Sequence, residues 1–261
     1  MESMTLLQAL IFGVVEGFSE FLPISSTAHL ILTAHVLGLP QTEFLKSFQI
    51  AIQSGAILSV VVLYWRSFLR NWEELKRIFC GFIPTAVVGF VLYKVIKKYF
   101  MDDLNIVLAA LFLGGIVLIL FEKWGSSAQK IEVGVGKMTY RQALLIGLCQ
   151  SLAVIPGVSR SAATIISGVL LGVGRKTAVE FSFLLAVPTL AAATALDILK
   201  NADSFSKDQF GVLAVGFIAS FVVALICIKT FLAVIQKHSF AVFGVYRILI
   251  AIVFWLFLMR A

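Results

Sequence analysis

Two apolar stretches are interrupted at their middle by a proline: FLPISST at residues 21–27 and VIPGVSRS at residues 154–161. Each lies between two apolar segments that are too short or too polar to cross a hydrocarbon core, which takes about 20 helical residues. These segments are 5–22, 24–39, 140–155 and 159–174. A helix, a proline turn and a helix that returns to the same side form a re-entrant hairpin, which is tolerated inside protein or beside a wet cavity. We therefore predict two re-entrant hairpins.

The composition of the whole chain indicates a lipid environment. Of 261 residues, 60% are hydrophobic and 13% are charged, whereas a soluble domain carries about 25% charged residues. Disordered chains and ordinary soluble enzymes are thereby excluded. Six further stretches are long enough to span a bilayer: 44–65, 78–96, 104–121, 179–199, 211–235 and 240–259. We predict an all-α polytopic membrane protein with six transmembrane helices, in which residues 1–261 form a single membrane domain.

The two hairpins match each other at a constant offset of 134 residues, which indicates an internal duplication. The matched pairs include Gly13 with Gly147, Glu16 with Gln150, Ser25 with Ser159, Ser26 with Arg160, and Gly38 with Gly172. We predict a first repeat at 1–125 and a second at 138–261. Because a hairpin adds no net crossing and three spans follow it, the second repeat starts from the opposite side. The result is an inverted-topology repeat whose hairpin tips meet near the midplane.

The basic residues predict how the chain is oriented. The formal net charge is +7, and in a membrane protein such an excess marks cytoplasmic loops rather than nucleic-acid binding. More Lys and Arg fall on the side opposite the termini, so that side is predicted to be cytoplasmic. We expect the first hairpin to open outward and expect no nucleic-acid partner.

Two carboxylates precede the first proline turn. A charged group at the centre of a membrane helix costs about 2.5 to 3.5 kcal/mol, so Glu16 and Glu20 are functional candidates. Their spacing of four places both on one helix face, as oxygen ligands of a hard divalent cation such as Mg²⁺ or Ca²⁺. Alternatively, they accept hydrogen bonds from the backbone at the turn.

Three hydroxyls follow the same turn. Ser25, Ser26 and Thr27 stand at the predicted start of a helix, where they can cap it or bind phosphate through the free amides. His29 lies three residues beyond Ser26 on the same face, which suggests a nucleophile and its base. Ser25 and Thr27 are then left to cap the helix and bind phosphate.

The second turn contributes a fixed positive charge. Gly157, Ser159 and Ser161 supply a flexible turn and phosphate-binding groups, and the Arg160 guanidinium can fork onto phosphate oxygens. Since Arg160 is the repeat counterpart of Ser26, the predicted twofold brings nucleophile and anion clamp together. The alternative is a structural ion pair between Arg160 and one of the two carboxylates.

At these residues the chain resembles a known family. The segments EGFSEFLPISSTAHL at 16–30 and PGVSRS at 156–161 are similar to the signature motifs of the BacA-type undecaprenyl-diphosphate phosphatases, which are bacterial inner-membrane enzymes linked to bacitracin resistance. The resemblance covers essentially the whole chain. It implies hydrolysis of undecaprenyl diphosphate to the monophosphate plus inorganic phosphate, which recycles the peptidoglycan lipid carrier. It also implies a site that is open to the periplasm and depends on a divalent cation.

The resemblance also implies residue roles. By matching position, the family's acidic pair falls on Glu16 and Glu20, its serine nucleophile on Ser26, its histidine on His29 and its arginine on Arg160. Attack by His29 or by a metal-bound water stays open as an alternative. Ala28 and Ala162 stand where the family usually has glycine, a change that removes no catalytic group.

Two rival functions share parts of this pattern. A transporter or flippase of a polyprenyl phosphate would use the same inverted repeat with broken helices. Other membrane lipid phosphatases have a catalytic histidine soon after a Ser-Arg motif, but here none follows Arg160 before His238. The expected partners are the polyprenyl diphosphate and membrane lipids, and a homodimer is compatible with this prediction.

Overall fold

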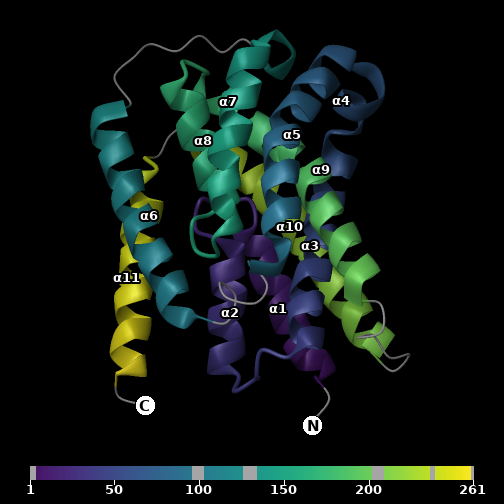
Figure 1. Ribbon diagram of the computed structural model, residues 1–261, viewed down its shortest axis with the longest axis vertical. Helices are drawn as coiled ribbons and strands as arrows, with labels where there is room; N and C mark the ends of the chain where they lie inside the picture. Colours follow the sequence, from purple (N-terminus) through teal and green to yellow (C-terminus); the bar gives the residue numbers. More distant parts are fainter. Residues whose placement is uncertain (1–3, 96–102, 126–133, 202–208, 236–238, 260–261) are drawn as a thin grey trace.

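The computed structural model describes residues 4–95, 103–125, 134–201, 209–235 and 239–259, and all regular elements in these ranges are helical (Figure 1). The elements are α1 (Leu6–Ser19), α2 (Ser26–Val36), α3 (Glu43–Leu63), α4 (Trp65–Arg70), α5 (Trp72–Val95), α6 (Leu104–Gly125), η2 (Val135–Lys137), α7 (Tyr140–Gln150), η3 (Ser151–Val154), α8 (Arg160–Leu170), α9 (Arg175–Asn201), α10 (Phe210–Ile235) and α11 (Ala241–Leu258).

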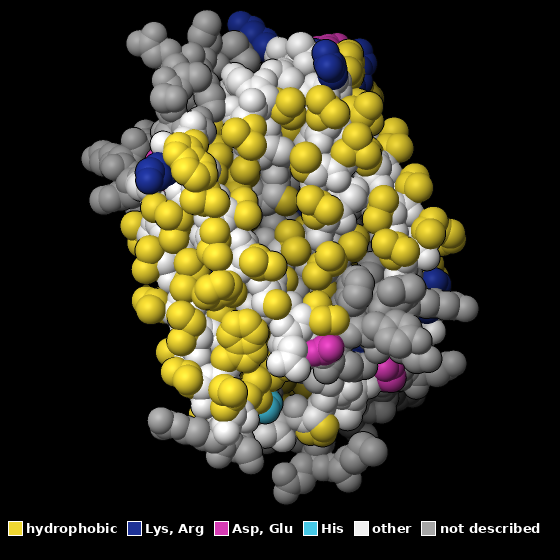
Figure 2. Space-filling model, turned by 60° about the vertical axis from the view of Figure 1, so that its left-hand side comes forward, with side chains coloured by type: hydrophobic (Ala, Val, Ile, Leu, Met, Phe, Trp, Pro, Cys, Tyr) yellow, Lys and Arg dark blue, Asp and Glu magenta, His cyan; other side chains and the backbone are white. Residues whose placement is uncertain are grey.

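Six helices are long and apolar enough to cross a membrane, and they correspond to the six predicted spans. They cover Glu43–Leu63, Trp72–Leu92, Leu104–Trp124, Arg175–Asn201, Phe210–Ala233 and Ala241–Leu258. Figure 2 shows that hydrophobic side chains cover most of the described surface on one face of the molecule. Such a surface suits lipid and would be an aggregation liability in water. The prediction of an all-α polytopic membrane protein is confirmed.

Two short helical hairpins lie among the long helices, and their first helices expose apolar side chains such as Phe18 and Leu148 on the surface. The first is α1 with α2 and the second is α7 with α8; Figure 1 shows them entering from opposite ends of the molecule, so that their turns meet in the middle. The Ser161 hydroxyl donates a 2.9 Å hydrogen bond to the Phe21 carbonyl and joins one turn to the other. The hairpins therefore bring two distant parts of the sequence to one point.

The hairpins agree in local detail at the offset of 134 residues. Both begin with a capping box, at Thr5 with Gln8 and at Thr139 with Gln142. Both turns end at a serine with a left-handed φ, 72° at Ser25 and 76° at Ser159, and both second helices are followed by a glycine of positive φ, Gly38 and Gly172. Serine caps in this conformation are strained, and only a surrounding structure that holds them in place keeps them there.

Helix packing follows the same pairing. Helix α1 packs on α10 and α3 packs on α10, while α7 packs on α5 and α9 packs on α5. Gly13 and Gly147 allow two of these close approaches, since an added Cβ on Gly13 would lie 2.5 Å from the Gly216 carbonyl oxygen, and Gly147 meets the Gly81 backbone. The repeat bounds of 1–125 and 138–261, and the orientation of the repeats in a bilayer, stay predictions.

A core of aromatic side chains anchors the first turn. Phe21 is fully buried and packs edge-to-face on Phe183 of α9, with ring centroids 5.1 Å apart. The guanidinium carbon of Arg160 lies 5.9 Å from the Phe21 ring centroid. Both turns are therefore fixed against α9, which sets the position of the groups that follow them.

Candidate active site

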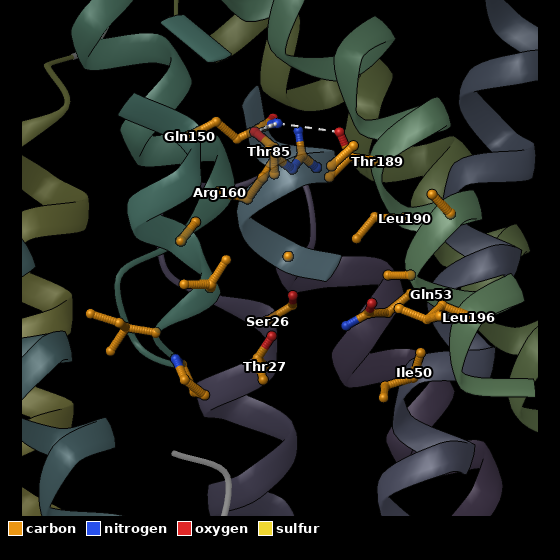
Figure 3. A pocket seen from close by; sticks show the side chains of 18 of the residues that line it. Ser26, Thr27, Ile50, Gln53, Thr85, Gln150, Arg160, Thr189, Leu190 and Leu196 are labelled. Carbon is orange, nitrogen blue, oxygen red and sulfur yellow. Dashed lines mark hydrogen bonds between the residues drawn. The ribbon is translucent and has the colours of Figure 1, made fainter. Parts of the chain in front are cut away.

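A cavity of about 610 Å³ lies where the two turns face α3, α5 and α9 (Figure 3). Its polar lining is Glu20, Ser25, Ser26, Thr27, Gln53, Thr85, Gln150, Ser159, Arg160 and Thr189. Much of the remaining lining is apolar and comes from α3, α5 and α9, including Ile50, Phe82, Phe90, Leu190, Leu196 and Leu199. The cavity thus combines a polar end at the turns with an apolar wall.

Both turns place a functional side chain on the first residue of a helix. Helix α2 starts at Ser26 and α8 starts at Arg160, each directly after a capping serine. The Ala162 amide donates to the Ser159 hydroxyl over 3.2 Å, and Ser25 caps the Ala28 amide in the same way. The first amides of a helix lack partners within it, and the positive end of the helix dipole lies there. Two such helix starts at one cavity favour an anionic ligand.

Ser26, Glu20 and Arg160 form a chain of hydrogen bonds on the cavity wall. The Ser26 hydroxyl donates to Oε2 of Glu20. Arg160 Nη2 donates to Oε1 of the same carboxylate over 2.8 Å. The side chains of Arg160 and Glu20 are 10% and 4% exposed, so little water screens this pair. The alternative expected from the sequence, an ion pair of Arg160 with a carboxylate, is present and lies beside the serine.

A second contact fixes the plane of the Arg160 guanidinium. Its Nη1 donates to the Ser182 carbonyl over 2.7 Å and contacts the Ser182 hydroxyl at 3.1 Å. Among the described residues, the buried Nε of Arg160 has no hydrogen-bond partner. The guanidinium therefore keeps one unused N–H donor, which protein atoms cover, while both terminal nitrogens are held in place.

His29 does not contact Ser26, contrary to the expectation from their i, i+3 spacing. Its Nδ1 lies 2.8 Å from the Ser25 carbonyl oxygen, and its Nε2 lies 2.9 Å from the Tyr246 hydroxyl. The ring also stacks on Tyr246 at an interplanar angle of 7°. Both nitrogens are engaged because the side chain turns toward α11. Glu20, and not His29, is the group that accepts the Ser26 hydrogen bond.

Glu16 is fully buried, and neither of its carboxylate oxygens has a hydrogen-bond partner among the described residues. Glu20 and Arg160 are the charged groups that act on it. A buried carboxylate without a partner is costly, and two neighbouring carboxylates are a donor set that suits a hard cation. Among the residues that the structure describes, no group of three His, Cys, Asp or Glu side chains could hold a metal. Glu16 and Glu20 are thus oxygen donors of the kind that a divalent cation takes, and the cation stays a prediction.

The predicted phosphate-binding groups divide into two sets. Ser25, Thr27, Gly157 and Ser159 line the cavity. Ser161 does not, because its hydroxyl is spent on the Phe21 carbonyl. Gly157 has a φ of 101° and an added Cβ would lie 2.6 Å from the Val107 carbonyl oxygen, so this turn cannot accept a side chain there.

The chain matches the family described as bacitracin resistance protein BacA over residues 9–253. The chain belongs to the BacA family. It is 51% identical to the undecaprenyl-diphosphatase of Aquifex aeolicus (strain VF5), over 96% of this chain and 98% of the relative. It is 49% identical to that of Sulfurihydrogenibium sp. (strain YO3AOP1), over 97% of this chain and 99% of the relative. These relatives are named as hydrolases and not as carriers, which favours the phosphatase over the transporter alternative.

The cavity of this BacA-family chain also contains a polar side chain for which no role was predicted from the sequence. Gln150, the repeat counterpart of Glu16, donates through Nε2 to Thr85 over 2.8 Å and to Thr189 over 3.2 Å. Its buried Oε1 has no hydrogen-bond partner in the part of the chain that the structure describes. Figure 3 shows this group on the wall near Arg160. Alignment of the repeats could have identified Gln150, because it pairs this residue with the carboxylate of Glu16. The two threonines belong to α5 and α9 and lie in no motif, so no sequence pattern indicates their role.

Arg247 of α11 is a second residue for which no role was predicted from the sequence. Its side chain is fully buried and donates to carbonyls of both turns, among them Pro23 and Gly157. One signal could have found it, since an arginine inside the predicted span 240–259 is expensive in a membrane.

Proposed function

We propose that the chain is an undecaprenyl-diphosphatase, which hydrolyses the prenyl diphosphate to the monophosphate and inorganic phosphate. The named relatives and the family support the reaction. The observation that carries its mechanism is the hydrogen-bonded chain from Ser26 through Glu20 to Arg160 on the wall of the cavity. These hydrogen bonds bring a nucleophile, a proton acceptor and a cationic side chain together.

The cavity suits both ends of such a substrate. The diphosphate binds at the starts of α2 and α8, where Ser25, Thr27, Ser159 and Arg160 line the wall. The prenyl chain lies along the apolar wall of α5 and α9. Phe90 and Leu199 line the cavity and are also 68% and 81% exposed, so this wall continues to the lipid-facing surface. The lipid tail can therefore stay in the bilayer during the reaction.

The first chemical step is attack by Ser26 on the terminal phosphorus. The Oγ–P bond forms, the hydroxyl proton passes to Glu20, and the anhydride P–O bond breaks with its electron pair on the prenyl monophosphate. Arg160 donates to the phosphate oxygens, where charge accumulates in the transition state. The leaving monophosphate is already an anion of low basicity, so no strong acid is required.

The second step is hydrolysis of the phosphoserine. Water attacks phosphorus, the bond to Ser26 Oγ breaks, and that oxygen regains a proton from Glu20. Glu20 accepts the proton that the attacking water loses and releases it to solvent with the inorganic phosphate, so that the carboxylate is restored. A divalent cation held by Glu16 and Glu20 would neutralise charge on the phosphate oxygens. Gly157 and the capping serines hold the turns, and His29 positions the first turn through the Ser25 carbonyl.

The location follows the same proposal. The chain is a multi-pass membrane protein, and we place it in the bacterial inner membrane with the cavity open to the periplasm. The excess of basic residues on the side opposite the termini supports this orientation. A homodimer stays a prediction.

The test is phosphate release by purified protein in detergent, where no second compartment exists. We expect release from undecaprenyl diphosphate, loss of release with a chelator, and a labelled phosphoserine at residue 26 after acid quench of substrate labelled in the terminal phosphate. Ser26→Ala is the matched control and must show neither release nor label. Absence of release by the folded wild-type chain in the presence of Mg²⁺ and Ca²⁺ would refute the proposal.

A further inference from the structure

Arg247 makes five hydrogen bonds, and all of them go to main-chain carbonyls. Nε donates to Leu111 over 3.2 Å, Nη1 donates to Pro23 and Val158 over 3.2 Å each, and Nη2 donates to Ala110 over 3.1 Å and to Gly157 over 2.6 Å. An arginine has five N–H donors, so its capacity is fully used. Three of the acceptors, Pro23, Gly157 and Val158, belong to the two turns.

These turn carbonyls need a donor from elsewhere. Carbonyls in a proline turn have no partner within a helix, and in the membrane interior they must be satisfied by protein. Arg247 reaches them by passing α6 at Gly114, where an added Cβ would collide with the guanidinium. The missing side chain at Gly114 and the arginine on α11 thus fit each other, and together they connect α6 and α11 with both hairpin turns.

The helix pair itself does not need an arginine at this position. Helices α6 and α11 meet through a reciprocal glycine contact, since an added Cβ on Gly115 would lie 2.7 Å from the Gly244 carbonyl oxygen, and one on Gly244 would lie 2.6 Å from that of Gly115. Three positions after each glycine stand Leu118 and Arg247. Leu118 is 1% exposed and packs in the hydrophobic core. Leu118 and Arg247 therefore stand at equivalent positions of the helix contact. Leucine is sufficient for packing on α6, whereas α11 has arginine at the position that faces the turns.

The charge of Arg247 is not neutralised by an acidic side chain. In the described ranges of the chain, its hydrogen bonds all go to carbonyls and no carboxylate forms an ion pair with it. Carbonyl dipoles satisfy the donors but leave the full positive charge in place. That charge lies behind the turns from which Ser26 and Arg160 project. An anion in the cavity is therefore attracted by a buried cation that it does not touch.

We propose that Arg247 is a positioning residue for the reaction, which holds the Pro23 turn and the Gly157–Val158 turn at the spacing that aligns Ser26 with Arg160. Its charge also stabilises the phosphoryl group during transfer. The inference rests on the proposed phosphatase function and adds to it a residue outside the hairpins. A misplacement of reacting groups by about 1 Å can cost about a hundredfold in rate, so even a small shift of one turn is expected to lower kcat.

The experiment compares Arg247→Met and Arg247→Lys with Leu118→Met, which makes the matched change on the other helix. Thermal unfolding and size-exclusion profiles in detergent establish which variants fold, and phosphate release gives kcat and KM for the folded protein. We expect Arg247→Met to lower kcat by about tenfold or more with a smaller change in KM. Arg247→Lys keeps the charge and has three donors, so it should recover part of kcat. Leu118→Met should match the wild type in kcat.

The outcomes separate the inference from the proposed function. A folded Arg247→Met variant with the kcat of the wild type would overturn the inference, as would a lysine variant that is no more active than the methionine variant. If Arg247→Met does not fold, the lysine variant decides: a lowered kcat with unchanged thermal stability supports positioning, and wild-type kcat refutes it. A wild-type chain that releases no phosphate counts against the proposed function instead.

Discussion

Ser26 donates its hydroxyl hydrogen bond to Glu20. The carboxylate is six residues earlier in the sequence, on the other side of the proline turn, so the turn itself creates the contact. Arg160 holds the second carboxylate oxygen from the opposite hairpin. Glu20 is thereby held as the acceptor of the serine hydrogen bond, and the histidine that shares a helix face with Ser26 contacts the Ser25 carbonyl instead.

This geometry predicts unequal losses at Glu20 and His29. Glu20→Gln keeps the size and an acceptor for Ser26 but cannot take a proton, so kcat should fall by about a hundredfold or more. His29→Gln can still donate to the Ser25 carbonyl, so its loss should be clearly smaller. Steady-state phosphate release from both folded variants decides the order. A His29→Gln loss greater than that of Glu20→Gln would return the base to the histidine.

The three hydroxyls of the first turn are expected to differ sharply. Ser26→Ala should abolish release, because it removes the hydroxyl that donates to Glu20. Ser25→Ala removes a helix cap at a left-handed φ, which should cost about 1 to 3 kcal/mol of stability, and should leave a measurable rate, as should Thr27→Ala. Ser26→Cys should retain at most a trace. Comparable rates for the Ser26→Ala and Thr27→Ala proteins would exclude Ser26 as nucleophile and favour attack by His29 or a metal-bound water.

Arg160→Lys tests the planar fork of the guanidinium. A lysine retains the charge but cannot hold Ser182 and Glu20 in one plane while it donates to a ligand. We expect turnover to fall by about tenfold or more while the protein still folds. Ser182→Ala removes the hydroxyl contacts with Arg160 and Thr164 but keeps the carbonyl acceptor of Arg160, so it is the milder control. Near-normal turnover of the lysine variant would show that charge alone is sufficient.

Glu16 and Glu20 are expected to hold the divalent cation together. Glu16→Gln removes one charge from the pair without removing the proton acceptor, so it should raise the Mg²⁺ or Ca²⁺ concentration needed for half-maximal activity. Titration of chelated protein with each ion, followed by activity and by calorimetry, measures this shift. An unchanged metal titration would leave Glu16 as a structural carboxylate.

The strained cap at Ser159 predicts that the glycine variant is more stable than the alanine variant, which is the reverse of their order inside a helix. At a φ of 76°, glycine is free of strain and alanine is not. Ser159→Gly should therefore change the free energy of unfolding by a few tenths of a kcal/mol, whereas Ser159→Ala should cost about 1 to 3 kcal/mol from the lost cap and the strained backbone. Thermal unfolding in detergent measures both. Equal melting temperatures would mean that the turn relaxes to an ordinary φ.

The fold was predictable where length and hydropathy decide it. The six spans follow from runs of apolar residues, and the hairpins follow from prolines at 23 and 156 within segments too short to cross. Most of the lining at the turns was also predictable, because motifs name Glu20, Ser26 and Arg160 directly. The contact predicted between His29 and Ser26 was wrong. Helical spacing tells which residues share a face but not toward which neighbour a side chain turns.

Contacts between distant helices could not be predicted in the same way. Thr85 and Thr189 are ordinary residues of long helices, and only the packing of α5 and α9 around the turns brings them to Gln150. Ser161 lies within a motif, yet its hydroxyl joins the turns and does not face the cavity. Such roles depend on the relative placement of helices, which a single sequence does not contain.

Arg247 has a consequence for how the protein is made. Its contact with Pro23 spans 224 residues of sequence, and the ion pair of Arg160 with Glu20 spans 140. A ribosome delivers Ser26 and Glu20 to the membrane early, Arg160 much later, and α11 after both hairpins. Under the proposed mechanism, the nascent chain carries its nucleophile for most of synthesis without the means to use it. If Arg247 positions the turns as proposed, full hydrolytic competence arises when α11 inserts beside α6, and activity then reports that membrane insertion has proceeded through α11.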